Sequence, residues 1–251
     1  MLKGLATVFA MSLISLSLAS QTAKVVHAPG TSKEAALSFD FKGDAIGETL
    51  QQFKDRNAHT ATYEVFFLDS DGDTREGSKL KIQLPICTGD KEESNPDLDL
   101  PELKRSEQEV RLGIIRCVVT PHQQGKSGKD EWGYWSEFPT IADSKTLSSI
   151  YRFYKDKLYS IEITFAFTDY DRVTNALIAK FGMPRSKENR AYRSGSGTKL
   201  HDEVLVWKRK TSSLTANAVY GATNISSVVF TDDELAAAVK SATETPARED
   251  L

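Results

Sequence analysis

Three consecutive stretches decide the fold: Ser149-Ile-Tyr-Arg-Phe-Tyr154, the polar Lys155-Asp156-Lys157, and Leu158-Tyr-Ser-Ile-Glu-Ile-Thr-Phe165. Apolar and polar residues alternate along both outer stretches, which is the pattern of strands with one buried face. A short polar turn between two such strands predicts a β-hairpin. The side chains expected on one face of its second strand are Tyr159, Ile161, Ile163 and Phe165.

A helix is predicted directly after this hairpin. Thr168 and Asp169 can cap its start, and Gly182 followed by Pro184 ends it in the usual way. Apolar residues recur between these signals at helical spacing and form one stripe. The stripe consists of Tyr170, Val173, Leu177, Ile178 and Phe181.

The rest of the second half continues with strands and one more helix. Residues 203–209 and 213–220 predict a second hairpin, 226–231 a further strand, and Asp232-Asp233 the cap of a last short helix. The basic, Ser/Gly-rich run 185–201 is expected to be a loop. Hairpins in succession, without alternating strand–helix units, predict an α+β fold in which an antiparallel sheet carries its helices on one face.

The first half is less regular. Leu37, Phe39 and Phe41 alternate with polar residues, residues 48–57 predict a short helix that buries Leu50 and Phe53, and residues 63–68 predict a strand. The pattern leaves open whether this half is a sub-module similar to the second half. It also leaves open whether residues 60–140 share the sheet of the second half.

The predicted organisation has five segments. They are a cleaved signal peptide (1–20), a flexible lead-in (21–36), a loop-rich N-terminal α+β module (37–140), a C-terminal α+β module (141–240) and a disordered tail (241–251).

The N-terminus has the features of a secretory signal. Lys3 supplies a positive charge, Leu5 to Ala19 are almost wholly apolar or small, and Ser17 and Ala19 suit the −3 and −1 positions of a cut site. Ala23 is a second candidate. This apolar run is too short to cross a bilayer, and no later stretch is long enough. We therefore expect a protein without an integral membrane segment after cleavage, either periplasmic or secreted.

Composition excludes one class of function. The formal net charge of −3 becomes about −4 once the signal and its lysine are removed. A nucleic-acid-binding domain would be basic on one face and have a high pI, so no nucleic-acid partner is expected.

The two cysteines predict one disulfide. Cys87 and Cys117 each follow an apolar, strand-like run, and the segment between them is acidic and contains proline. In an oxidising compartment an even pair of cysteines reads as a bridge. The alternative is two buried free thiols.

Several motifs resemble those of known exported proteins. They are Phe41-Lys42-Gly43 with Gly47, the hairpin from Tyr151 to Phe165, Lys180-Phe181-Gly182 with Pro184, and Val206-Trp207. Over residues 39–53 and 149–235 the chain resembles a group of uncharacterised exported bacterial proteins. Its helix, Phe-Gly-x-Pro and strands also resemble periplasmic modules of the BamE (SmpA/OmlA) and β-lactamase-inhibitor-protein type, which implies binding to other proteins. BamE-type modules are usually lipoproteins, whereas this chain lacks the lipobox cysteine that would directly follow such a signal.

A candidate binding patch lies in the first half. Four aromatic residues crowd into what reads as a Gly-containing polar loop, and aromatic side chains on loops often form binding hot spots. The alternative is that they complete the core. The patch consists of Trp132, Tyr134, Trp135 and Phe138.

Motifs for metals and cofactors are weak or missing. Asp69, Asp71 and Asp73 have the spacing that begins a Ca²⁺ loop, but Thr74 and Leu80 stand where such a loop needs Gly and Glu. A solvated acidic turn explains them equally well. The four histidines are scattered, so no zinc site can be read from their spacing. No cofactor is expected.

Two classes of function remain. The sequence favours an exported, non-enzymatic protein that binds an envelope or extracellular protein, or that is otherwise associated with the envelope. The alternative is a hydrolase that acts on an envelope polymer through paired carboxylates. A cleft holding two carboxylates with raised pKa values would favour the hydrolase.

Overall fold

The computed structural model describes most of the chain after the predicted lead-in. The described residues are 38–68, 74–90, 100–119, 131–135, 139–193, 199–220 and 224–244. The predicted signal peptide and lead-in lie outside them.

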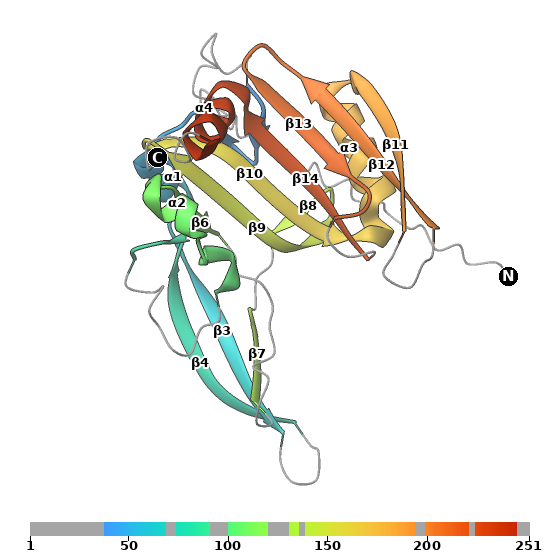
Figure 1. Ribbon diagram of the computed structural model, residues 1–251. Helices are drawn as coiled ribbons and strands as arrows, with labels where there is room; N and C mark the ends of the chain where they lie inside the picture. Colours follow the sequence, from blue (N-terminus) through green and yellow to red (C-terminus); the bar gives the residue numbers. More distant parts are fainter. Residues whose placement is uncertain are drawn as a thin grey trace, which may run out of the picture. The chain divides into compact units, whose positions relative to one another are not determined.

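Among the described residues, nine strands pair into one antiparallel sheet (Figure 1). Its order is β11-β12-β13-β14-β10-β9-β6-β5, and β8 pairs with β9 beside this path. The strands are β5 (Ile86–Cys87), β6 (Ile115–Val118), β8 (Thr140–Ile141), β9 (Ser144–Tyr154), β10 (Lys157–Ala166), β11 (Ser186–Arg193), β12 (Lys199–Lys208), β13 (Ser212–Asn217) and β14 (Ile225–Asp232).

The predicted hairpin is confirmed as β9 and β10, near the middle of this sheet. Its turn residues Lys155 and Asp156 have φ angles of 49° and 61°, which is the left-handed conformation that two-residue hairpin turns require. The face assignment was wrong for one residue. A register shift between Leu158 and Ser160 places Tyr159 in a different apolar cluster from Ile161, because a bulge interrupts the alternation of side chains.

A second antiparallel sheet has the order β4-β3-β7. It consists of β3 (His59–Leu68), β4 (Thr74–Leu84) and β7 (Glu131–Trp135). The strands within residues 60–140 therefore belong to two different sheets. β5 and β6 are part of the large sheet, whereas β3, β4 and β7 form the second sheet. The predicted boundary near residue 140 thus runs through the large sheet.

Two short helices begin with complete capping boxes. In α1 (Leu50–Asn57) the side chains of Thr49 and Gln52 each accept from the other's backbone N–H. In α2 (Glu107–Arg111) Ser106 and Glu109 do the same. Each reciprocal cap satisfies backbone donors that the helix itself leaves unpaired. A single turn of 3₁₀ helix, η3 (Pro101–Leu103), lies before α2.

The longer helices are α3 (Tyr170–Phe181) and α4 (Asp233–Glu244). The predicted stripe of α3 is confirmed, since Val173 and Leu177 are buried. A 3₁₀ turn, η4 (Phe167–Asp169), precedes α3, and Gly182 ends it with a φ of 82°. In the described part of the chain no helix is both long and apolar enough to cross a bilayer.

The two longer helices pack on opposite faces of the large sheet (Figure 1). Val173 and Leu177 of α3 pack in one cluster with Ile161 and Phe165. Leu235 and other residues of α4 pack with Tyr159 and its neighbours in another cluster. The expectation that all helices lie on one face is therefore not met, because the sequence pattern gives each helix an apolar side without saying which face that side covers.

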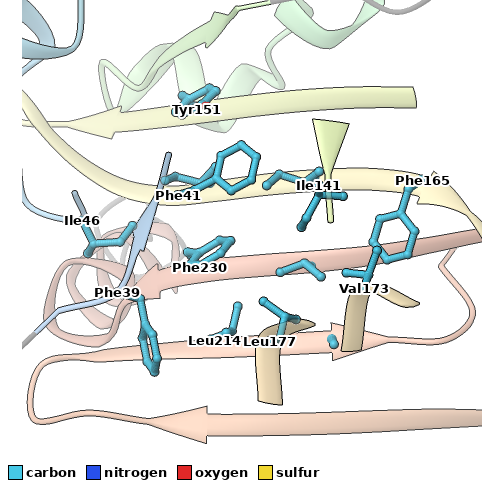
Figure 2. Packing of buried hydrophobic residues seen from close by; sticks show 14 of the residues in the cluster. Phe39, Phe41, Ile46, Ile141, Tyr151, Phe165, Val173, Leu177, Leu214 and Phe230 are labelled. Carbon is cyan, nitrogen blue, oxygen red and sulfur yellow. The ribbon is translucent and has the colours of Figure 1, made fainter. Parts of the chain in front are cut away.

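The largest apolar cluster joins both halves of the chain (Figure 2). Phe39, Phe41 and Phe53 from the first half pack with residues of β9, β10, β13 and β14. Phe53 is fully buried, and its ring lies 4.6 Å from that of Tyr151 and 5.2 Å from that of Phe153 between centroids. One core therefore holds residues that the sequence assigned to two modules.

Two other sequence predictions need correction. Residues 186–193, expected within a loop, form β11 and pair along their length with β12. Ser241 to Glu244, expected in the tail, belong to α4. In both cases a polar segment with little apolar signal continues regular structure through backbone hydrogen bonds, to β12 for β11 and along the helix for α4.

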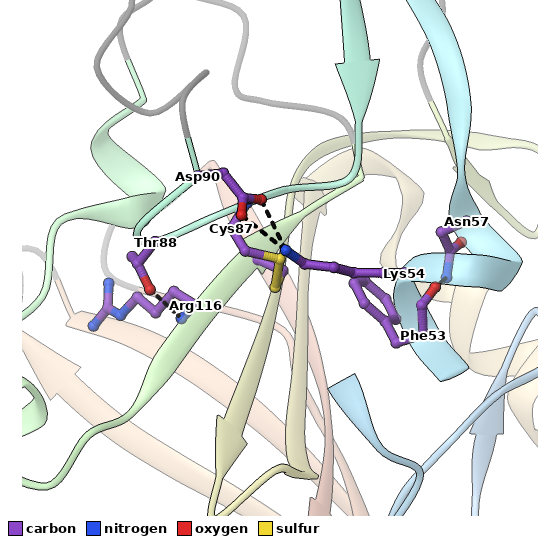
Figure 3. Close-up of a disulfide and its surroundings, with 8 residues drawn as sticks. Phe53, Lys54, Asn57, Cys87, Thr88, Asp90 and Arg116 are labelled. Carbon is purple, nitrogen blue, oxygen red and sulfur yellow. Dashed lines mark hydrogen bonds and ion pairs between the residues drawn. A yellow bond between two sulfur atoms is a disulfide. The ribbon is translucent and has the colours of Figure 1, made fainter. Parts of the chain in front are cut away.

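The predicted disulfide is confirmed between Cys87 and Cys117, which face each other on β5 and β6. Asp90 accepts hydrogen bonds from the Cys87 backbone N–H (2.8 Å) and from Lys54 Nζ (2.8 Å) (Figure 3). The bridge and Asp90 thus fix β5 to β6 and to α1.

Replacing both cysteines by alanine (C87A/C117A) should lower the free energy of unfolding by about 3–4 kcal/mol in the chain-entropy model, because the bridge closes a long loop. The sequence separation is 30. Urea unfolding of the wild type and the variant measures this difference. Wild type unfolded in excess dithiothreitol, which reduces the bridge without adding bulk to the buried sulfurs, should approach the variant. An unchanged midpoint and slope would contradict a stabilising role for the bridge.

Candidate functional site

Of the predicted aromatic patch, the structure describes the backbone of three of the four residues. Trp132, Tyr134 and Trp135 lie on β7, which pairs with β3, so these residues are on a strand and not on a loop. Their side chains and all of Phe138 lie outside the described residues. The binding role of this patch stays a prediction.

The weak Ca²⁺ candidates Asp69, Asp71 and Asp73 also lie outside the described residues. Within the described ranges, no group of three or more His, Cys, Asp or Glu side chains could hold a metal ion.

A pocket of about 240 Å³ opens on the sheet face that α3 covers. Its walls come from α3, from β14, from the turn after β8, and from the turn between β1 (Asp40–Phe41) and β2 (Asp44–Ala45). It is lined by Asp40, Phe41, Lys42, Thr140, Ile141, Ala142, Val173, Ala176, Leu177, Lys180, Phe181 and Phe230. We call it the α3 pocket.

The floor of the α3 pocket is apolar. Val173 and Phe230 are at most 1% exposed, and Phe41, Ile141 and Leu177 are each 6% exposed. The rings of Phe41 and Phe230 lie 5.9 Å apart. Figure 2 shows how these side chains converge from separate elements. Such a floor favours an apolar group over water.

Local sequence creates the walls. In the turn Phe41-Lys42-Gly43-Asp44, Lys42 has a φ of 52° and Gly43 a φ of 94°, so the chain reverses tightly and turns Phe41 into the core. Ala142 adopts a similar left-handed conformation, with a φ of 50°, in the turn after β8. On α3 the pocket side carries Ala176, whose small side chain leaves the mouth open.

Charged side chains stand only at the mouth. Lys180 Nζ forms an ion pair with Asp40 Oδ1 at 3.0 Å and lies 4.9 Å from the Phe181 ring centroid. Lys42 Nζ lies 5.8 Å from the centroid of the Phe41 ring. The ion pair connects α3 to β1, so it links two walls of the pocket.

A separate cluster of buried charges lies behind this turn. Asp44 is 2% exposed and Glu48 8% exposed. Arg56 pairs with both, at 3.0 Å from Asp44 Oδ1 and in close contact with Glu48 Oε2. Asn57 Nδ2 (2.8 Å) and the Tyr151 hydroxyl also donate to Asp44.

Burial raises the pKa of Asp44, against hydrogen bonds from Asn57, Tyr151 and Arg56 that lower it. Burial also raises the pKa of Glu48, against the opposing effect of Arg56. Paired carboxylates with raised pKa values are the feature that would favour a hydrolase. Neither residue lines the α3 pocket, however, and Arg56 occupies the space between them. Their geometry is that of a buried ion cluster that fixes the β1–β2 turn to α1.

The α3 pocket can bind but has little means of catalysis. Its titratable lining residues are Asp40, Lys42 and Lys180, and Asp40 is held by Lys180. The lining contains no Ser, Cys or His, so the usual nucleophile and base pairs are missing from it.

Sequence reasoning did not find this pocket. Its residues come from four separate parts of the chain, and most of them read as ordinary core positions. Ala176 gives no local signal, because in the sequence it reads as one more exposed position beside the buried stripe of α3.

No protein-family model, curated protein or solved structure matches this chain. The pocket and its surroundings are therefore the basis for a proposed function.

The raised pKa of Glu48 predicts an unusual dependence of stability on pH. A carboxyl group with a raised folded-state pKa binds more protons when folded, so the free energy of unfolding falls as pH rises from its ordinary pKa to the raised one. Glu48→Gln removes this effect. We expect the variant to resemble the wild type below about pH 4 and to become the more stable protein as the pH approaches neutrality.

Urea unfolding over a pH series measures this, with Glu109→Gln as the control. Burial alone would raise the pKa of Glu109, but hydrogen bonds from Ser106 and Arg116 outweigh it and lower the pKa. The wild type should therefore be more stable than Glu109→Gln near neutrality and lose that advantage as the pH falls through the lowered pKa. If Glu48→Gln instead loses stability relative to the wild type as the pH rises, folding does not raise the pKa of Glu48.

Proposed function

We propose that this protein is an exported, non-enzymatic binding protein of the periplasm or the extracellular space, and that its α3 pocket holds an apolar side chain of a protein partner. The α3 pocket is the observation that carries the proposal. An envelope or extracellular protein as partner also agrees with the resemblance to BamE-type and β-lactamase-inhibitor-type modules.

The size of the pocket supports a single compact group. Dry apolar cavities of about 150 Å³ accept benzene, and sites for drug-sized ligands begin at about 300 Å³. At about 240 Å³, the pocket fits one aromatic or branched aliphatic group. Burying such a side chain typically contributes about 1.5–3 kcal/mol, which suits an anchor within a larger interface.

Export is supported by two features. The apolar run with a small-residue cut site at the N-terminus has the features of a secretory signal. The Cys87–Cys117 disulfide is of the kind that persists in oxidising compartments.

The hydrolase alternative has less support. In the described part of the chain, the pair of carboxylates with raised pKa values is Asp44 and Glu48, and both are buried around Arg56. A substrate would have to displace this arginine to reach them.

Narrowing the pocket should weaken the binding of small apolar probes. Ala176→Trp places a large ring at the mouth, and we expect binding of toluene or indole to weaken by at least about tenfold. Heteronuclear NMR titration measures this, because in the wild type the shifts should centre on Phe41, Ile141 and Val173.

Ala179→Trp is the matched control, since Ala179 is an exposed residue on the same helix outside the pocket lining. It carries the same change in helix propensity and should bind like the wild type. Thermal unfolding of both variants tests whether either is misfolded. Equal probe binding by the two variants would show that the α3 pocket is not the binding site.

Cleavage of the signal is tested by the N-terminal residue of the protein recovered from the periplasm or the culture fluid. Sequencing should find a start close to residue 20, because Ser17 and Ala19 suit the cut site. Recovery of uncleaved chain in the cytoplasm would contradict export.

A further inference from the structure

We infer that the group held in the α3 pocket is the C-terminal residue of a partner polypeptide, with its side chain on the apolar floor and its free carboxylate at the mouth. This inference rests on the proposed function, which supplies the apolar site. The charges at the mouth supply the second element.

The charged side chains described at the mouth are two lysines and one aspartate, which leaves one positive charge there without a negative partner. Lys180 is paired with Asp40 at 3.0 Å. Lys42 lines the same pocket, pairs with no carboxylate among the described residues, and has its ammonium 5.8 Å from the Phe41 ring centroid. A cation next to an apolar cavity complements a ligand whose apolar part is attached to an anion.

The position of Lys42 is fixed by the structure behind it. Its backbone is held in a left-handed turn, with a φ of 52°. Arg56 donates to the Gly43 carbonyl oxygen at 2.7 Å and pairs with Asp44 at 3.0 Å. The buried ion cluster therefore anchors the backbone from which the Lys42 side chain reaches the mouth, which assigns that cluster a role in positioning.

The chemistry of a chain end fits this arrangement. In a C-terminal residue, the side chain and the carboxylate are attached to the same Cα atom. A side chain on the floor of a pocket for one compact group therefore brings its carboxylate to the mouth, near Lys42 and Lys180. An internal residue would bring neutral amides there, and a chain's N-terminus would bring a positive charge that Lys42 repels. A free amino acid would bring an ammonium beside its carboxylate, which partly cancels the attraction to Lys42.

The test compares short Gly-Ser-Gly-Phe peptides that end in a free carboxylate or in an amide, with binding to the purified, disulfide-bonded protein measured by calorimetry. We expect the acid to bind about fivefold more tightly than the amide, as for an exposed ion pair. This preference should decrease as salt is added.

Two substitutions, one that removes a positive charge and one that removes a negative charge, test whether the preference for the acid arises at the mouth of the pocket. Lys42→Asn keeps a residue type that tolerates the left-handed turn and should remove the preference for the acid. Asp40→Asn removes the negative charge at the mouth and should increase that preference. Because both residues line the pocket, the readout for each variant is the ratio of acid to amide affinity, and binding of toluene reports whether the apolar floor is intact.

Lys155→Asn is the matched control for Lys42→Asn. Lys155 also has a left-handed backbone, with a φ of 49°, and also lies over the preceding aromatic ring, 5.2 Å from the Tyr154 centroid. It does not line the pocket, so its substitution should leave the preference for the acid unchanged.

The outcomes separate this inference from the proposed function. If acid and amide bind equally to the wild type, the carboxylate inference is overturned and the apolar pocket stands. If 3-phenylpropanoate binds more tightly than the peptide acid, the ligand is a small carboxylic acid and the chain-end inference is overturned. If toluene and both peptides fail to bind, the proposed function falls as well.

Discussion

The fold depends on the burial of one face of β10, the strand that pairs with β9 on one side and β14 on the other. Ile161, Ile163 and Phe165 have no exposed surface, and β10 pairs with β14 over seven residues in unbroken register. Burying each of these side chains contributes about 1.5–3 kcal/mol. Because only the three residues of η4 separate the end of β10 from the start of α3, the apolar stripe of α3 meets this same face.

The α3 pocket follows from how that face is covered. One part lies under α3, and another lies under Phe39, Phe41 and Ile46 from the first half of the chain. These two groups of residues are distant in sequence, and the Asp40–Lys180 ion pair connects them at their shared edge. A small residue at the seam, Ala176, leaves a space that a larger side chain would fill.

The buried ion cluster fixes the conformation of the short β1–β2 turn next to the pocket. Desolvation of Asp44 and Glu48 costs free energy, as their raised pKa values indicate. Buried ion pairs are weak evidence for stability, and a role in fixing conformation has to be argued for each protein. Here Arg56 ties both carboxylates and the Gly43 carbonyl to α1, so the cluster sets the path of the β1–β2 turn from which Lys42 extends.

Elements with a local signal could be predicted from the sequence. The β9–β10 hairpin, the α3 stripe with its Gly182 end, and the Cys87–Cys117 bridge were all predicted, because alternation, helical spacing and cysteine pairing can be read over short windows. Tertiary structure alone decided that Tyr159 faces away from Ile161, that α3 and α4 take opposite faces, and that polar β11 pairs with β12. It also decided the candidate site, since the pocket unites Phe41, Ile141, Leu177 and Phe230. The physical reason is that a bulge, the choice of a sheet face and the meeting of distant residues depend on pairing across the chain, and no short window of sequence contains that information.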